Sequence, residues 1–558
     1  MKILLAYPPF SEERIRDEDV RAVPIGLYYV GARLLERGHR VRLANWHDVH
    51  RRPGEVARTL AEFRPDVLGL SLFNANRWGA LAVAREAKRL DPSVRVVFGG
   101  VGATFLWRHF LAHFPEVDYV VIGEGEETMA DLAAHLEAGG GAAPAAVPGL
   151  AFRGPEGPVR TAERPFIEDL DTLPDPARRF TFQHVVSSRG CPWNCRFCGS
   201  PRFWKRRVRF HSPDYFVGQI ETLARKGVTY FFVSDDTFTL RKDRVIEICR
   251  RIADARLPVA WQAISRVNCV DGEVLYWMRR AGCRQISYGV ESGSPRIRAF
   301  FEKRFTDDEV RRAFDLTRRF GILPRAYFIY GAPGESRKTI DASIRLMREI
   351  RPLALAAYVL DIYPGTRLYE EYKRRHRVSD DVWLSPAEDL LYFETDPALD
   401  GEKVHRLGRR LKRAFHEGLP EFAESLELED RPELRPLHAD FLSRLAMTFS
   451  HGEYARVGDI PRKAETAEVL FRRALEWHPL PAAYLGLGVL RQKARDFPGS
   501  IEVLEAGLAR FPDDEQLHLC LAVSLMNTGD FAGALAHLER FPDSEAARRY
   551  LPVCRANL

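Results

Sequence analysis

The sequence predicts an α/β protein built from an N-terminal doubly wound parallel sheet, a partial (β/α)6 TIM-like barrel and C-terminal all-α repeats. Three observations predict this fold class. Strand-like and helix-like segments alternate over residues 1–145, a second strand–helix series starts near residue 181, and the last hundred residues repeat with a period of about 34.

Composition sets the broad class of the protein. A chain of 558 residues is long enough for three or four domains of about 150 residues each. No uninterrupted apolar run approaches the ~20 residues that cross a bilayer, and the short apolar start resembles a first strand more than a signal peptide. Eight cysteines without a disulfide pattern fit a reducing compartment, so we expect a cytoplasmic protein without a membrane span. The mild net charge of +6 does not favour nucleic acid as a partner.

Residues 1–145 are expected to form the first domain. Glycine-bearing turns follow its fourth and fifth strands, at Gly99-Gly100 and around Glu124, and ligands of open α/β sheets bind at such strand ends. The spacing of these glycines is not that of a dinucleotide fingerprint, so NAD is not favoured. The five expected strands are residues 3–7, 41–46, 67–73, 94–99 and 119–123.

A glycine-, alanine- and proline-rich stretch leads to residues 146–180, which we expect to be a linker or a hairpin edge. The partial barrel is then assigned to residues 181–400. Its six expected strands are residues 184–186, 230–234, 260–265, 285–290, 325–330 and 355–362.

The C-terminal region is predicted to be helical throughout. Residues 401–455 form a connector, and residues 456–558 contain similar segments that end at Pro479, Pro512 and Pro542. Asp496 and Asp530 mark the same turn one period apart. This pattern resembles tetratricopeptide repeats, which present a concave surface to peptides. The alternative is two or three ordinary helical hairpins.

Three cysteines carry the strongest chemical signal. Cys191, Cys195 and Cys198 form a C-x3-C-x2-C motif, and three thiolates so close can each hold one iron of a [4Fe–4S] cluster. Three ligands leave the fourth iron open to substrate, as in catalytic zinc sites. With Phe197 before the third cysteine, the motif resembles that of radical SAM enzymes. The alternative is structural zinc or a chance cluster, but no fourth ligand of zinc lies nearby.

The resemblance to radical SAM enzymes extends over residues 181–370. Asp235 and Asp236 end the second barrel strand, where the resemblance implies contacts to the SAM ammonium or ribose; the alternative is a helix N-cap. The segments after the fourth and fifth strands are similar to the ribose-contacting and adenine-contacting turns of that family. The implied SAM-binding residues are Phe197, Asp235, Asp236, Glu291, Ser292, Gly331 and Pro333.

Residues 1–135 resemble the cobalamin-binding domain of the B12-dependent radical SAM subfamily. The matching segments are 7–9, 24–27, 69–71, 99–100 and 123–126, in that order. The resemblance implies a corrin over the strand ends, a nucleotide tail beside a strand, and cobalamin contacts at Ser71, Gly99, Gly100 and Glu124. The loop of residues 8–24 lacks the cobalt-binding histidine of other cobalamin domains, and we interpret His50 as part of a surface loop.

The resemblance implies a cobalamin-dependent radical SAM enzyme with three cofactors: a [4Fe–4S] cluster, S-adenosylmethionine and cobalamin. Such an enzyme cleaves SAM reductively to a 5′-deoxyadenosyl radical, and methylation of an unactivated carbon is the expected outcome. One alternative is a ring-forming or oxidative cyclase without methyl transfer, and another is a repeat-mediated peptide- or protein-binding factor. No cysteine precedes Cys191, which argues against the methylthiotransferases that carry a second, N-terminal cysteine trio.

Expected partners follow from the same resemblance. They are a small-molecule or carrier- or peptide-borne substrate, an electron donor such as flavodoxin or ferredoxin, and a protein partner of the repeats. Residues 202–210 are rich in basic and aromatic side chains, which could bind an anionic substrate or RNA. The alternative is a solvated loop in which Arg209 makes a local ion pair, and we prefer this second interpretation. The substrate and the catalytic acid or base do not follow from the sequence.

Overall fold

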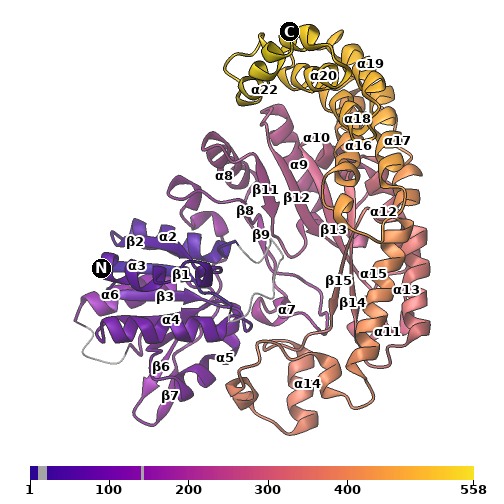
Figure 1. Ribbon diagram of the computed structural model, residues 1–558. Helices are drawn as coiled ribbons and strands as arrows, with labels where there is room; N and C mark the ends of the chain where they lie inside the picture. Colours follow the sequence, from indigo (N-terminus) through magenta and orange to yellow (C-terminus); the bar gives the residue numbers. More distant parts are fainter. Residues whose placement is uncertain (11–21, 140–143) are drawn as a thin grey trace.

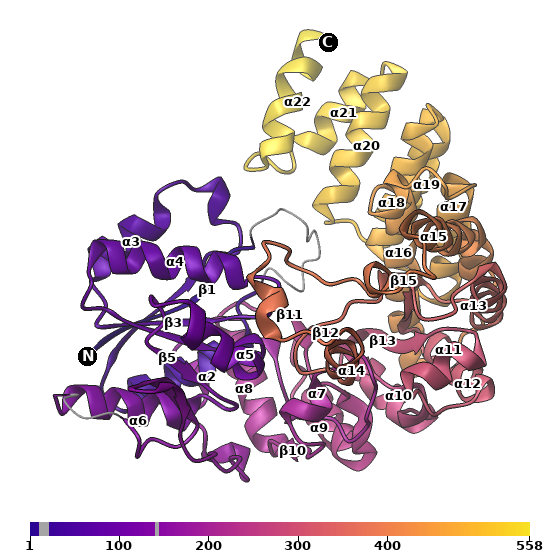
Figure 2. The same cartoon turned by 90° about the horizontal axis from the view of Figure 1, so that it is seen from below.

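The computed structural model describes residues 1–10, 22–139 and 144–558. Two sheets lie side by side, the first mostly and the second entirely parallel, and an arc of helices borders the second sheet on the far side from the N-terminal domain (Figures 1 and 2). The fold class predicted from the sequence is confirmed. No helix in the described part of the chain is both long and apolar enough to cross a membrane.

The first sheet has seven strands in the order β2-β1-β3-β4-β5-β6-β7. Its strands β1 to β5 are parallel, and alternate residues of β1 enter two separate cores. Ile3 and Leu5 face α2 and α6, whereas Leu4 faces α3, α4 and α5. Burial on both faces explains why these strands are apolar runs in the sequence. The elements are β1 (Lys2–Tyr7), α2 (Ile25–Glu36), β2 (Arg40–Asn45), α3 (Glu55–Phe63), β3 (Val67–Ser71), α4 (Arg77–Leu90), β4 (Arg95–Gly99), α5 (Gly100–His113), β5 (Tyr119–Val121) and α6 (Glu126–Glu137).

The segment expected to be a linker or a hairpin edge contains a hairpin at the edge of the first sheet. Strands β6 (Leu150–Gly154) and β7 (Gly157–Arg160) extend the sheet beyond β5 in antiparallel fashion, with Leu150 and Ala151 fully buried. The hairpin covers the backbone donors and acceptors that β5 would otherwise expose at the edge. Residues 140–143, part of the same glycine-rich stretch, lie outside the described residues.

The second sheet has six parallel strands in the order β15-β14-β13-β12-β11-β8, and all six match strands expected from the sequence. They are β8 (His184–Val185), β11 (Tyr230–Val233), β12 (Ala260–Ser265), β13 (Cys283–Glu291), β14 (Leu323–Tyr330) and β15 (Ala354–Val359). The helices of this part are α7 (Ser200–Phe203), α8 (Pro213–Arg225), α9 (Lys242–Asp254), α10 (Gly272–Arg280), α11 (Pro295–Phe301), α12 (Asp307–Arg319), α13 (Arg337–Ile350) and α14 (Arg367–His376).

Helices follow to the end of the chain: α15 (Gly401–Glu424), α16 (Arg435–Ser450), α17 (Lys463–Trp477), α18 (Pro481–Lys493), α19 (Phe497–Leu508), α20 (Glu515–Thr528), α21 (Phe531–Leu538) and α22 (Glu545–Ala556). The expected turn recurs in atomic detail. Asp496 accepts a hydrogen bond from the Gly499 amide at 3.0 Å, and Asp530 accepts one from the Gly533 amide at 2.7 Å. Both aspartates cap a helix start.

The helical tail divides into two cores, which makes truncation a sharp test. Leu470 and Phe471 of α17 belong to the hydrophobic core of the barrel, whereas α20–α22 build a separate core around Leu517. We therefore expect a chain ending at residue 495 to remain folded and to keep its cluster and cobalamin. A chain ending at residue 455 is expected to aggregate, because it loses core side chains of α17 and uncovers their partners in α15 and α16. The yield of soluble protein and its iron content measure both outcomes. A soluble chain of residues 1–455 with a full cluster would contradict the claim that α17 belongs to the core of the barrel.

Candidate functional site

A cavity of about 310 Å³ lies between the carboxyl ends of the first sheet and the loop that follows β8. Its wall includes Ser71, Gly99, Gly100 and Glu124, the four positions expected to bind cobalamin. Asp236, expected to bind SAM, lies on the opposite wall together with Gly190 and Trp204. The structure therefore brings residues predicted for two different cofactors to one space.

The cavity continues as an apolar slot along one face of the first sheet. Leu5, Gly69, Val97 and Val121 form its floor, and Val30 of α2 and Met129 of α6 lie across from them. Gly69 leaves the middle of β3 without a side chain, and a Cβ at this position would come within 2.7 Å of the Leu5 side chain, which would have to shift. A slot without a side chain in the middle of β3 fits the nucleotide tail that the sequence resemblance implies.

The turn after β4 brings the backbone close to the cavity. Gly100 has a φ of +87°, and a Cβ there would lie 2.9 Å from the Leu72 carbonyl oxygen and the Ser71 hydroxyl. The Gly102 amide donates to the same Leu72 carbonyl at 3.0 Å. Only glycine fits this left-handed turn without strain, and the open backbone suits a bulky, flat ligand such as a corrin.

We expect that no histidine of this chain binds the cobalt of cobalamin, and substitution of His50 tests this directly. His50 is exposed in a short 3-10 helix, outside the cavity wall, and neighbouring Asp48 pairs with Arg52 at 2.7 Å. Residues 11–21 of the other candidate loop lie outside the described residues. We expect His50→Ala to leave the absorption spectrum of bound hydroxocobalamin unchanged, whereas Gly100→Val should abolish binding. Loss of a histidine-ligated spectral form in His50→Ala would contradict this account.

The cysteine loop is held in place by its neighbours. It starts at Gly190, whose φ of +104° and close approach to the Arg207 carbonyl admit no side chain. The Arg196 amide donates to the Phe301 carbonyl at 3.2 Å, and the Phe197 ring packs edge-on against the Phe301 ring, with 5.2 Å between the centroids. In this structure Phe197 therefore supports the loop from behind. It is not among the residues that line the cavity.

The three thiols do not converge on a point where a single ion would bind all of them. All three cysteines are free and half-buried, and burial raises the pKa of Cys198 to about 12, which favours the neutral thiol until a cation binds. Zinc bonds of about 2.3 Å would draw three thiols to roughly 3.8 Å of one another. Among the described residues only one group of candidate ligands lies within 4.8 Å, and it contains no cysteine.

The adjacent carboxylates of β11 have different surroundings. Asp235 is buried and accepts hydrogen bonds from the Ser187 amide, the Ser187 hydroxyl and the Ser188 hydroxyl, at 2.5–2.6 Å. It therefore joins β11 to the strand that enters the cysteine loop. Asp236 faces the cavity and accepts a hydrogen bond from the Ser200 hydroxyl at 2.8 Å. Its side chain is exposed to the cavity, but the surrounding protein disfavours the charged form and raises the pKa of Asp236. Of the two, Asp236 is better placed to meet a cationic ligand.

The remaining SAM positions lie at the ends of β13 and β14, outside the cavity wall. Glu291 has a φ of +64° beside a register shift in β13, and it pairs with Lys303 at 2.8 Å. Such strain in a non-glycine residue concentrates at functional sites. Ser292 is buried and bonds within its own turn and to Ser343. Gly331, at φ +87°, precedes Pro333 in the turn after β14.

A buried ion network joins the two domains, and sequence reasoning missed it. Glu124 accepts from Arg189 and Arg209 at 2.7 Å each, and Glu126 accepts from Arg189 at 2.6 Å. Burial raises the pKa of Glu124, but the hydrogen bond from Arg209 and both positive charges outweigh it, so the pKa is lowered overall. The Arg189 guanidinium also lies 5.1 Å from the centroid of the Tyr29 ring. Arg209 was expected to make a local pair; its partner lies 85 residues away.

The neighbouring basic side chains also contact other residues of the same chain. Lys205 pairs with Glu163, Arg207 pairs with Glu168 at 2.8 Å, and Arg206 donates to the Pro192 carbonyl at 2.9 Å. These contacts favour the interpretation of residues 202–210 as a solvated loop and not as a surface that binds nucleic acid.

Comparisons with known proteins agree with this geometry. The B12 binding domain model matches residues 19–133, and the radical SAM superfamily model matches residues 185–347. The chain is 33% identical over 434 residues to an uncharacterized methyltransferase of Pyrococcus horikoshii, covering 75% of this chain and 92% of that protein. It is 30% identical over 344 residues to the anaerobic magnesium-protoporphyrin IX monomethyl ester cyclase of Cereibacter sphaeroides, covering 58% and 56%.

A solved structure shares the fold. The radical S-adenosylmethionine methyltransferase TsrM from Kitasatospora setae, with cobalamin and a [4Fe–4S] cluster bound, superposes with a TM-score of 0.62 at 18% identity. The match covers 85% of this chain and 99% of TsrM.

Proposed function

This chain belongs to the cobalamin-dependent radical SAM family, and on that premise we propose that it methylates an unactivated carbon of its substrate. The observation that carries the proposal is the single cavity whose wall joins the strand ends of the cobalamin domain to residues beside the cysteine loop. A shared cavity lets a methyl donor and a substrate radical meet without release into water. The methyltransferase relative that spans three quarters of the chain adds support.

The family's cofactors are the three expected: a [4Fe–4S] cluster, SAM and cobalamin. When bound, they supply a low-potential electron, a hydrogen-abstracting carbon radical and a transferable methyl group. The chain's own residues hold and shield these groups. We assign Cys191, Cys195 and Cys198 to the cluster irons and Asp236 to the cationic end of SAM. The apolar slot under Gly69 excludes water from the tail of cobalamin, and the Glu124 network fixes the two domains around the cavity.

Product analysis separates methyl transfer from the competing reaction. The reconstituted enzyme is incubated anaerobically with SAM, a reductant and a set of candidate substrates, and all SAM-derived products are quantified by mass spectrometry. Methyl transfer predicts S-adenosylhomocysteine and 5′-deoxyadenosine in equal amounts, and a product heavier by one methylene. A ring-forming or oxidative reaction, favoured by the likeness to the cyclase, predicts 5′-deoxyadenosine without S-adenosylhomocysteine. That second result would overturn the proposal.

We further propose that α17–α22 form tetratricopeptide-like repeats that recruit a protein, or a substrate borne on a carrier or peptide. The recurring aspartate caps and the separate core around Leu517 support this. A cytoplasmic electron donor such as flavodoxin or ferredoxin completes the proposed system. A chain ending at residue 495 should still cleave SAM but turn over its physiological substrate more slowly; full activity on that substrate would contradict recruitment.

A further inference from the structure

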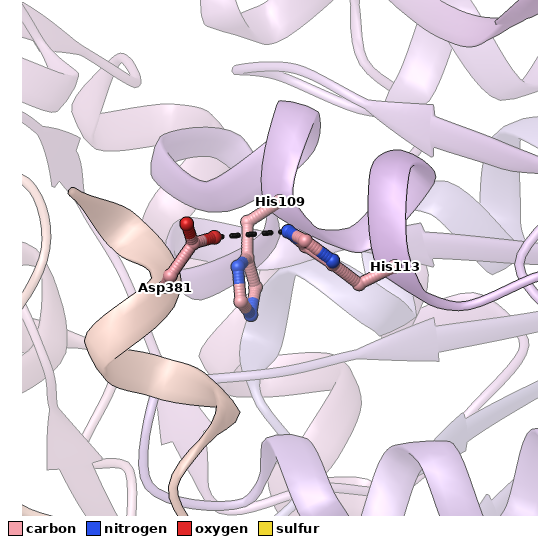
Figure 3. A group of neighbouring side chains, drawn as sticks. All are labelled: His109, His113 and Asp381. Atoms are coloured by element: carbon pink, nitrogen blue, oxygen red, sulfur yellow. Dashed lines mark hydrogen bonds and ion pairs between the residues drawn. The ribbon is translucent and has the colours of Figure 1, made fainter.

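Away from the cavity, three side chains with metal-binding atoms converge between two parts of the chain. His109 and His113 lie one turn apart on α5, so both imidazoles project from the same face of that helix. Asp381 comes from the 3-10 helix η6 (Asp380–Leu384) and points toward them (Figure 3). One ligand atom of each residue lies within 4.8 Å of the others, and His113 Nε2 is 2.9 Å from Asp381 Oδ1.

His109 is buried, and no contact within the described part of the chain explains why a polar ring lies there. The residue is 4% exposed, and neither ring nitrogen has a hydrogen-bond partner. A buried polar group left without a partner costs about 1–3 kcal/mol, so such groups are rare in native proteins. Burial and the neighbouring His113 lower the pKa of His109 to about 4, which keeps the ring neutral at pH 7. A neutral imidazole is the form that coordinates metals.

We propose that His109, His113 and Asp381 bind one divalent transition-metal ion, with zinc as the best match. Two imidazoles at positions i and i+4 of a helix plus one carboxylate form a recurrent three-ligand set for zinc. Zinc bonds of about 2.0–2.2 Å require ligand atoms roughly 3.3–3.6 Å apart, which small side-chain rotations supply here. The side chains of His113 and Asp381 are 37% and 60% exposed, so water has access to the remaining position.

The position of this site indicates a structural role. Residues 380–391, which we call the strap, run from the barrel side across the first domain. Arg77 of α4 already anchors the strap, because its buried guanidinium donates to the Trp383 carbonyl at 3.3 Å and to the Glu388 carbonyl at 3.2 Å. A metal on Asp381 would anchor the start of the strap to α5 in the same domain. Binding energy at such a site adds to the stability of the folded chain.

The test counts zinc in the full-length protein with its cluster loaded, so that the cluster cysteines are not available to the ion. The protein is equilibrated with zinc chloride, passed through a desalting column and analysed for metals. We expect about one zinc per chain in the wild type and at least a tenfold weaker affinity in both His113→Gln and Asp381→Asn. Both side chains are partly exposed, so these variants should fold, and unchanged iron content verifies that. His50→Gln, a substitution of an exposed histidine elsewhere in the first domain, should retain the zinc.

Two further measurements locate the ion. X-ray absorption at the zinc edge should show only nitrogen and oxygen neighbours, and added zinc should raise the thermal midpoint of the wild type but not of Asp381→Asn. No retained zinc, equal retention in Asp381→Asn, or sulfur in the first coordination shell would each overturn the proposal.

Discussion

Replacing Cys198 with alanine should abolish both cluster assembly and SAM cleavage. Cys198 is half-buried beside Cys191 and Cys195, and its loss leaves one of the cluster's three cysteine-held irons without its thiolate ligand. The measured content of iron and sulfide should fall from about four of each per chain to near zero. The production of 5′-deoxyadenosine should fall below detection, because the cluster supplies the electron for SAM cleavage.

Cys520→Ala is the matched control for this variant. Cys520 is a buried, free cysteine in α20, within the separate core of the tail. Its loss should leave the iron content and SAM cleavage unchanged. Retention of a redox-active cluster in Cys198→Ala would refute the assignment of the three cysteines, and about eight irons in the wild type would reveal a second cluster.

The second large effect is expected from Glu124→Gln. Both Glu124 oxygens are hydrogen-bonded to buried guanidiniums, from Arg189 and Arg209. The amide leaves two buried positive charges with less compensation, and breaking such a buried pair costs about 3–5 kcal/mol. The free energy of unfolding should fall by that amount, and cobalamin should bind more weakly because Glu124 also lines the cavity. Chemical denaturation and cobalamin titration measure the two effects.

The control for this variant and its pH dependence follow from the same contacts. Glu163→Gln removes the partner of Lys205 at the surface, where an ion pair contributes about 0–1 kcal/mol. The pKa of Glu124 is lowered in the folded chain, so its contribution is present above the unfolded value of about 4.3. This contribution to stability is lost as the pH falls through the lower pKa that Glu124 has in the folded chain. Wild type and Glu124→Gln should therefore converge in acid; a constant difference would contradict the charged network.

The strands of both sheets could be predicted because parallel strands buried on two faces are short apolar runs, as in β1 and β4. For the stretch that contains β6 and β7, the sequence left a linker and a hairpin edge equally open, because the hairpin is short, contains glycine and is defined by its pairing with β5. The cysteine motif and the strand-end glycines are local signals, so their place in the site could be predicted.

Contacts between distant residues could not be predicted in this way. Glu124 and Arg189 are 65 residues apart, and only the packing of two domains brings them together. The same holds for Asp235, whose carboxylate is occupied by Ser187 and Ser188. The helical spacing of His109 and His113 is visible in the sequence, but Asp381 lies 268 residues beyond His113.

The central claim is that one cavity brings the cobalamin and the cluster together. Electron paramagnetic resonance of the holoenzyme, reduced so that both the cobalt and the cluster carry an unpaired electron, tests it most directly. We predict signals broadened by magnetic coupling between the two centres, and loss of that broadening in Cys198→Ala, which keeps only the cobalamin signal. A spectrum equal to the simple sum of two isolated centres would contradict the shared cavity.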